Sequence, residues 1–155
     1  MTMYAVESRR LSEQDTAVQY ATLRRHEIGP WLEKAFREVA AYLDRKGAGP
    51  AGPPFARYHR VADDLFELEA GFVATTPTAG EGDVEPSELP AGFAAVTEHF
   101  GACGPIEGAY DAIETWVRAQ HGVPAGDPWE VYFDDPNGDA EPAAWKTEIV
   151  QPYRV

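Results

Sequence analysis

The segment PAGPPFARY at residues 50–58 returns, with changes, as PAGDPWEVY at residues 124–132. Shifting the chain by the same 74 residues also aligns the apolar residues of the preceding segments, which are spaced as on the buried face of a helix. The aligned pairs are Leu32 with Ile106, Phe36 with Tyr110, Val39 with Ile113, Tyr42 with Trp116, and Leu43 with Val117. The chain is therefore predicted to contain two copies of one module.

The repeat predicts one amphipathic helix in each copy, over residues 30–46 and 105–120. A proline suits the first position of a helix, and a glycine suits the position just after its last turn. Pro30 and Pro105 are accordingly expected to begin the helices, and Gly47 and Gly122 to end them.

Strand-forming residues surround both helices and predict a β-α-β-β unit in each copy. A turn is expected at residues 135–138. The expected fold class is α+β, with tandem modules related by a pseudo-twofold axis around a ligand groove. We expect a single domain over residues 1–155, with modules at 15–74 and 92–153 and a polar linker at 75–91. The expected strands are residues 17–24, 54–60 and 65–73, then 93–100, 128–134 and 145–150.

The charge of the chain narrows the classes of partner. A formal net charge of −13 disfavours direct binding of nucleic acid, because no basic stripe offsets the repulsion from phosphates. The single cysteine excludes an internal disulfide, and the sequence begins without an apolar signal region or a membrane-length apolar run. These features predict a cytoplasmic protein that does not associate with membranes.

The two copies of the repeat differ at one position that carries chemistry. Glu130 occupies the place of Ala56, while a tyrosine follows two residues later in both copies, as Tyr58 and Tyr132. Strand alternation puts Glu130 and Tyr132 on one face, which we expect to line the groove, and Trp129 on the face packed against the helix. A carboxylate among aromatic rings suits a lipophilic cation, and a solvated or arginine-paired glutamate is the alternative.

The order and spacing of several segments resemble the GyrI-like small-molecule-binding domains. These segments are residues 89–117, PWEVY at 128–132 and KTEIVQP at 146–152, and the resemblance runs from about residue 15 to the C-terminus. Such domains bind effectors in AraC-type and MerR-type multidrug regulators, and they also occur alone. The resemblance implies paired β-α-β-β modules of the SHS2 type around a ligand groove.

The same resemblance implies which residues bind the ligand. The family's cation-binding glutamate corresponds to Glu130, and Tyr132 and Trp145 match other pocket positions. Tyr58, Tyr110 and Trp31 are further candidates. A second acid found in one cation-binding regulator corresponds to Ala143, which argues against strict selectivity for cations.

Three functions are compatible with these residues. The first is a stand-alone protein that senses or sequesters a lipophilic, possibly cationic drug or natural product. The second is a hydrolase of electrophilic natural products, with Glu130 and Tyr132 as its catalytic residues. The third is a protein that binds and inhibits DNA gyrase, and the possible protein partner is accordingly gyrase or a regulator. No cofactor is expected, and His99 and Cys103 lack the second ligand pair that a metal site would need.

Overall fold

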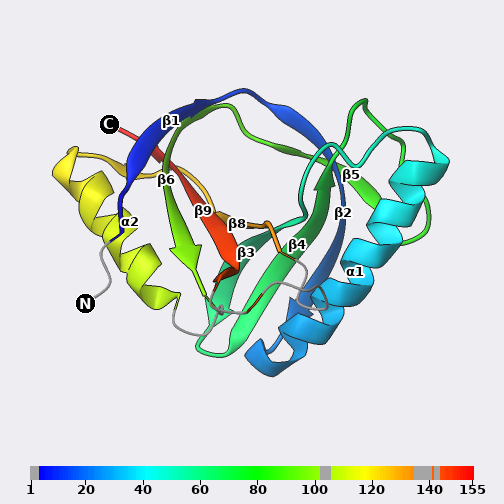
Figure 1. The fold of residues 1–155 in the computed structure, drawn as a ribbon, viewed down its shortest axis with the longest axis horizontal. Helices are drawn as coiled ribbons and strands as arrows, with labels where there is room; N and C mark the ends of the chain where they lie inside the picture. The colour runs from blue at the N-terminus through cyan, green and yellow to red at the C-terminus, as the bar shows by residue number, and fades with distance from the viewer. Residues whose placement is uncertain (1–3, 102–105, 135–140, 142–143) are drawn as a thin grey trace. The chain divides into compact units, whose positions relative to one another are not determined.

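The protein is described by a computed structural model that covers residues 4–101, 106–134, 141 and 144–155. The chain divides into two compact units. The first unit comprises residues 12–91, and the second comprises residues 1–11 together with residues 92–155. Each unit packs one long helix against an antiparallel sheet, so the fold class is α+β, as predicted (Figure 1).

In the first unit, helix α1 (Arg25–Arg45) packs on strands β2 (Gln14–Leu23) and β4 (Leu65–Val73). Strand β3 (Phe55–Ala62) pairs with β4, and β5 (Glu85–Leu89) pairs with β2. The strand order is therefore β3-β4-β2-β5. The core beneath α1 is apolar and includes Ala17, Val39, Tyr42, Leu43, Phe72 and Val84, with Phe36 packed against it.

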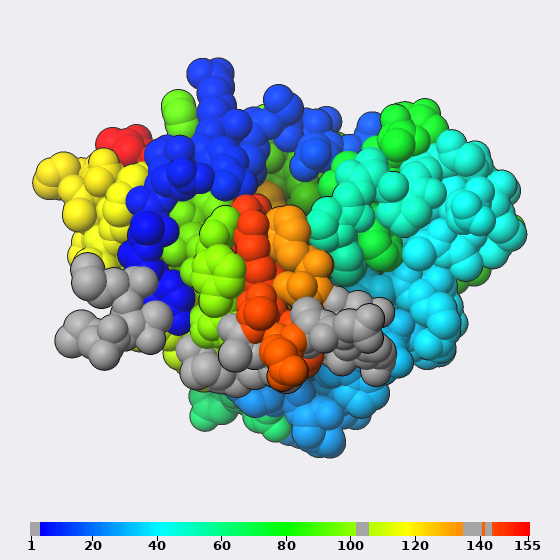
Figure 2. Space-filling view, viewed as in Figure 1, coloured from blue at the N-terminus to red at the C-terminus, as the bar shows by residue number. Residues whose placement is uncertain are grey.

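In the second unit, helix α2 (Glu107–Ala119) packs on strands β6 (Gly92–Phe100) and β9 (Lys146–Arg154). Strand β8 (Trp129–Tyr132) pairs with β9, and β1 (Glu7–Leu11) pairs with β6. The short β7 (Val123–Pro124) also pairs with β9. Strands β6, β9 and β8 form adjacent green, red and orange columns in Figure 2. The core beneath α2 is built from Ala95, Ala109, Ile113, Val117 and Ile149.

The two units follow the same path, which confirms two β-α-β-β modules. In each, the last strand of the module lies between the other two, as β4 does in β3-β4-β2 and β9 does in β8-β9-β6. Ala56 lies opposite Ala70, and Glu130 lies opposite Ile149, at the corresponding places of the two sheets. Ala56 and Glu130 are therefore topologically equivalent, as the repeat predicted.

Each module also has a fourth strand that the sequence reading did not predict. Strand β5 lies within residues 75–91, which were expected to be a linker, and β1 lies before the first expected strand. Their sequences, VESRRL at 6–11 and VEPSEL at 84–89, share an initial Val-Glu and a final Leu. The repeat is therefore longer than PAGPPFARY indicated. The strands are exchanged, since β1 precedes the first module but completes the sheet of the second, and β5 does the reverse.

Helix α1 begins earlier than Pro30, so the expected start was wrong. The Glu27 carboxylate accepts a hydrogen bond from the backbone N–H of Arg24 at 2.8 Å, which fixes the N-terminus one and a half turns before the proline. Pro30 lies inside the helix. The corresponding Pro105 lies outside the described residues, as does the turn expected at 135–138.

The two helices end in the same motif but with different residues. After α1, Gly47 has φ +64°, and Ala48 N–H donates to Leu43 C=O at 2.9 Å, as in a Schellman motif. After α2, the left-handed position is His121, with φ +61°, and Gly122 N–H donates to Val117 C=O at 3.0 Å. The expectation that Gly122 plays the part of Gly47 was wrong by one residue. Neither helix, among the residues described, has the length and apolarity needed to cross a membrane.

Candidate functional site

A buried carboxylate lies beneath α2. Glu130 is the second residue of β8 and its side chain is 7% exposed. It lies opposite Ile149, whose side chain belongs to the core under the helix. The sheet therefore places an ionisable group where an apolar residue would ordinarily pack.

Two tyrosine hydroxyls hold the carboxylate. Tyr110, on α2, donates a short hydrogen bond to Oε2 of Glu130. Tyr132, on the same face of β8, donates to Oε1 at 2.8 Å. Both donors are neutral, and Glu130 forms no ion pair with a lysine, arginine or histidine among the described residues. The carboxylate is satisfied in hydrogen bonds but has no bound counter-ion.

This environment changes the acidity of the group. Burial raises the pKa of Glu130 above its ordinary value, because a dry environment disfavours the charged form. The hydrogen bonds from Tyr110 and Tyr132, and the nearby His99, act in the opposite direction on this pKa without cancelling the effect of burial. Glu130 therefore holds its proton to a higher pH than a glutamate in water.

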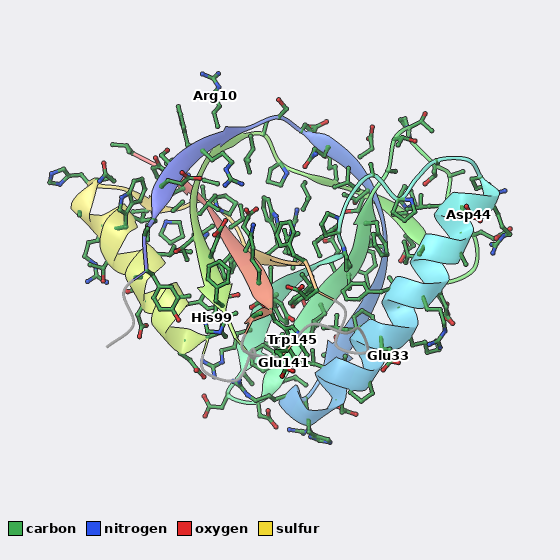
Figure 3. The ribbon with its side chains drawn as sticks, viewed as in Figure 1. Arg10, Glu33, Asp44, His99, Glu141 and Trp145 are labelled. Atoms are coloured by element: carbon green, nitrogen blue, oxygen red, sulfur yellow. The ribbon has the colours of Figure 1, made fainter. Side chains whose placement is uncertain are left out.

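A second polar pair lies on the same sheet face. His99, labelled in Figure 3, lies on β6 and is 3% exposed. Its Nδ1 lies 2.9 Å from the hydroxyl of Tyr4. The two rings stack with their centroids 6.0 Å apart. Thr97, two residues before His99, donates to the backbone carbonyl of Ala5 at 2.7 Å. Residues 4–6 thus cover the polar side chains of β6, with Tyr4 and Val6 packed against the α2 core.

Cross-strand register explains how these groups meet. Thr97, Ile149 and Glu130 form one row across β6, β9 and β8, and His99, Thr147 and Tyr132 form the next. Adjacent strands lie about 4.8 Å apart, and residues in both rows face α2. Thr147 is paired with His99 on one side and with Tyr132 on the other.

The expected alternation along β8 is confirmed, but its assignment to faces was wrong. Glu130 and Tyr132 share a face, yet this face is the one covered by the helix, since Tyr110 of α2 binds Glu130. Trp129 lies on the opposite face, where it is also buried. Val96 and Val150 are buried on that second face too. Neither face of the sheet therefore shows the alternating polar residues that mark a solvent-exposed face.

The structure groups three of the six expected ligand-binding residues, namely Tyr110, Glu130 and Tyr132. Trp145, labelled in Figure 3, belongs to the same unit and lies just before β9. Its backbone carbonyl accepts a hydrogen bond from the N–H of Gly101 at 2.8 Å. Tyr58 and Trp31 are half-buried residues of the first unit, and their part in ligand binding stays a prediction. Ala143 and Cys103 lie outside the described residues. Within the described part, no three His, Cys, Asp or Glu side chains come together as a metal site requires.

Tyr4 and His99 were not expected in the site. A signal for His99 was available, because alternation along FAAVTEHF places Ala95, Thr97 and His99 on one face and leaves the polar pair beside a core alanine. Tyr4 had no such signal, since the strand that follows it was not recognised.

No family model and no curated protein sequence matches the chain. Solved structures do match. The crystal structure of the EcmrR C-terminal domain aligns over 99% of both chains, with a TM-score of 0.74 and 18% identity. The chain has a GyrI-like fold.

Two other solved structures with this GyrI-like fold are described with different activities, one with a bound ligand and one as a hydrolase. SAV2435, solved with bound tetraphenylphosphonium, matches with a TM-score of 0.67 and 15% identity over 97% of this chain and 94% of its own. A protein described as a hydrolase from Listeria innocua matches with a TM-score of 0.69 and 13% identity over 96% and 91% of the two chains. In the EcmrR–DNA complex, the present chain spans 57% of the EcmrR chain.

Proposed function

We propose that this protein binds a lipophilic cationic small molecule through the carboxylate of Glu130. The observation that carries the proposal is a nearly buried carboxylate whose hydrogen bonds come from two neutral hydroxyls and which has no ion-pair partner among the described residues. An uncompensated buried carboxylate costs free energy, and a cation that displaces water from the site would supply the missing charge.

The aromatic surroundings favour a lipophilic cation over a small hydrated one. Tyr110 and Tyr132 present rings as well as hydroxyls, and a desolvated cation gains about 0.5–2 kcal/mol from each aromatic face that it contacts. The described residues also lack the oxygen-rich cluster that a metal ion would need. SAV2435, which has the same fold, is known with tetraphenylphosphonium, a cation of this type. Trp145, Tyr58 and Trp31 remain proposed ligand contacts.

Binding of tetraphenylphosphonium and of neutral triphenylphosphine oxide, measured by calorimetry at pH 8, tests the proposal. Replacing Glu130 with Gln keeps the shape of the side chain and removes its charge. We expect the cation to bind Glu130→Gln about 10- to 100-fold more weakly, the loss of one charge-assisted contact, and the neutral compound to be unaffected.

Glu98→Gln is the matched control, because Glu98 is an exposed carboxylate on the other face of the same sheet, 3.2 Å from Lys146. It changes the net charge equally and should leave both affinities unchanged. Equal binding of the cation to wild type and Glu130→Gln would refute the role of the carboxylate.

One observation favours a second function, hydrolysis of a neutral electrophile. The raised pKa of Glu130 lets the group keep a proton that it could donate to a leaving oxygen, and the Listeria innocua protein of the same fold is described as a hydrolase. In that case Glu130→Gln would still bind the neutral substrate while its turnover falls by about 10²- to 10⁴-fold. A panel of epoxide and ester compounds assayed with both proteins distinguishes the two functions.

A further inference from the structure

The ring of Tyr4 lies between side chains and backbone of two other elements. On one side it stacks on the imidazole of His99, on β6, with the ring centroids 6.0 Å apart and 25° between the ring planes. On the other side lies Gly108, in the first turn of α2, where an added Cβ would come within 3.2 Å of Cε2 of Tyr4. The hydroxyl of Tyr4 lies 2.9 Å from Nδ1 of His99. A strand, a helix and one polar atom thus hold a phenol.

The walls of this space and the ring inside it differ in how firmly the fold holds them. Strand β6 and helix α2 are regular elements that pack on each other around the core of the second unit. Tyr4 belongs to residues 4–6, which precede β1, form neither helix nor strand, and leave the tyrosine half-buried. Thr97 attaches this segment by its hydrogen bond to the carbonyl of Ala5. A short irregular segment can move away at a lower cost in free energy than the strand or the helix can.

The first unit shows that the fold does not require a ring at this place. The edge strands β1 and β5 have the same register on their partners β6 and β2. Continued to the neighbouring residues, this correspondence matches Tyr4 with Gly82 and His99 with Ala21. Helix α1 therefore packs on its sheet with neither a ring nor an imidazole at the matching positions.

We propose that the space between His99 and Gly108 is a binding subsite for a hydroxyaryl group of a ligand, and that Tyr4 is the chain's own occupant of this subsite. The ring of the ligand takes the place of the tyrosine ring on His99, and its hydroxyl takes over the hydrogen bond with Nδ1. A phenolic hydroxyl can donate to Nδ1 or accept from it, so either tautomer of the imidazole can hold the ligand. The inference goes beyond the proposed function, because it requires no charge on the ligand.

The position of the subsite relative to Glu130 follows from the register. His99 and Tyr132 belong to one cross-strand row, and Tyr132 binds Glu130. On α2, Gly108 comes two residues before Tyr110, which also binds Glu130. The hydroxyaryl subsite therefore lies under the same helix, on the sheet face that carries the carboxylate.

The first test removes the occupant. p-Cresol is the side chain of tyrosine as a free molecule, and toluene is the same molecule without the hydroxyl. By NMR titration at pH 7, Tyr4→Ala should bind p-cresol about tenfold or more tightly than the wild type, whose own phenol competes for the subsite. It should also bind p-cresol about 2- to 10-fold more tightly than toluene, the value of one hydrogen bond. Equal affinity of wild type and Tyr4→Ala for p-cresol, or tighter binding of toluene, would overturn the proposal.

The second test fills the subsite from the side of the helix. Gly108→Leu introduces a good helix former whose side chain takes the space of the ring. Added to Tyr4→Ala, it should abolish p-cresol binding. Thr115→Leu, at an exposed position of the same helix, is the matched control and should leave that binding unchanged. If p-cresol still binds Tyr4→Ala with Gly108→Leu, the bound phenol lies elsewhere and the assignment of the subsite is wrong.

The third test asks whether the wild type releases Tyr4. 2-Naphthol, which is neutral at pH 7, carries a hydroxyl on a larger aromatic surface and competes better than p-cresol. Nuclear Overhauser contacts between the rings of Tyr4 and His99 should disappear at saturating 2-naphthol and be replaced by contacts between the naphthol and His99. Tyr4→Phe, which keeps the ring, should bind 2-naphthol about 2- to 10-fold more tightly than the wild type, and it replaces Tyr4→Ala if that variant does not fold.

The same measurements separate this proposal from the proposed function. Contacts between Tyr4 and His99 that persist at saturating 2-naphthol would make Tyr4 a fixed part of the core and refute the subsite, whatever tetraphenylphosphonium does. Equal binding of tetraphenylphosphonium to wild type and Glu130→Gln would refute the cation site, while the p-cresol and 2-naphthol results would still support the subsite.

Discussion

The two modules pack their helices on equivalent strands in the same order, yet the side chains beneath the two helices differ. We compare the two cross-strand rows that face the helix in each unit. In the first unit these six positions are apolar except for Gln19 and Tyr58, whereas in the second unit all but Ile149 are polar. Taken row by row, Gln19, Ala70 and Ala56 in the first unit correspond to Thr97, Ile149 and Glu130 in the second, and Ala21, Leu68 and Tyr58 correspond to His99, Thr147 and Tyr132.

The comparison shows that the fold does not dictate the chemistry of its interior. The polar residues of the second unit come as a matched set, since Tyr110 takes the place of Phe36 and supplies the hydroxyl that Glu130 requires. Tyr132 has a counterpart in Tyr58, so one of the two donors is present in both modules. Among the groups that hydrogen-bond the carboxylate, the difference between the units is therefore Tyr110, whose counterpart Phe36 carries no hydroxyl.

The largest effect is expected from placing a glutamate in the first unit. Ala56 is fully buried, and Ala56→Glu would put a carboxylate beneath α1 where Phe36 offers no hydroxyl. We expect the free energy of unfolding to fall by about 3–5 kcal/mol at pH 8, the cost of an uncompensated buried charge. Urea unfolding followed by circular dichroism measures it.

A second substitution tests whether the matched set is the reason. Adding Phe36→Tyr to Ala56→Glu supplies the missing donor, and we expect it to recover about 1.5–3 kcal/mol, the value of a hydrogen bond to a charged group. Ala56→Gln reports the cost of size and of a buried polar group without the charge. If Phe36→Tyr lowers stability equally with and without Ala56→Glu, the correspondence with Tyr110 has no energetic meaning.

A smaller effect on stability is expected at Glu130, where removing the carboxylate should stabilise the protein at high pH. Because its pKa is raised in the folded protein, the folded state binds this proton more tightly than the unfolded state. The wild type should therefore lose stability relative to Glu130→Gln as the pH rises from 4.5, the ordinary pKa of the group, through its raised value. Urea unfolding at pH 4.5, 6 and 8 measures the difference, with Glu98→Gln as control. If the stability of the wild type instead increased relative to that of Glu130→Gln with rising pH, the burial of an uncompensated carboxylate would be contradicted.

The smallest effect concerns the helix ends. Gly47 and His121 occupy equivalent left-handed positions, and a Cβ at residue 47 would meet no atom within 4 Å. Gly47→Ala should cost about 1 kcal/mol from backbone conformation alone, and His121→Gly should recover a few tenths of that amount because glycine gains entropy when unfolded. Thermal unfolding measures both. If Gly47→Ala left the stability unchanged, a left-handed residue at this position would not be needed to end α1.

The modules were predictable from sequence because they repeat a pattern that physical chemistry reads directly. Apolar residues at helical spacing, joined by PAGPPFARY and its counterpart, identified the helices and the three strands of each copy. The first residues of the helices were harder to predict from the sequence. Pro30 resembled a first residue, and the Glu27 contact that actually begins α1 involves the backbone of an arginine, which carries no N-cap signal of its own.

The candidate site was half predictable. Glu130 and Tyr132 stood out because alternation and the repeat put them together, whereas Tyr110 was a candidate through the family resemblance. The covered face could not be assigned, since both faces of β8 are buried and the helix could have packed on either. Tyr4 lies 95 residues from His99 in the chain, and that contact depends on the exchange of β1, which no local pattern records.

The exchange of edge strands also decides which fragments of the protein could be expressed separately. The two units meet between residues 91 and 92, yet a fragment of residues 92–155 would lack β1, and β1 would stay in a fragment whose sheet does not include it. Trimming residues 4–11 as a dispensable leader would remove the edge of the unit that contains Glu130, together with Tyr4. The sheet formed by residues 92–155 is thus completed by residues at the other end of the polypeptide.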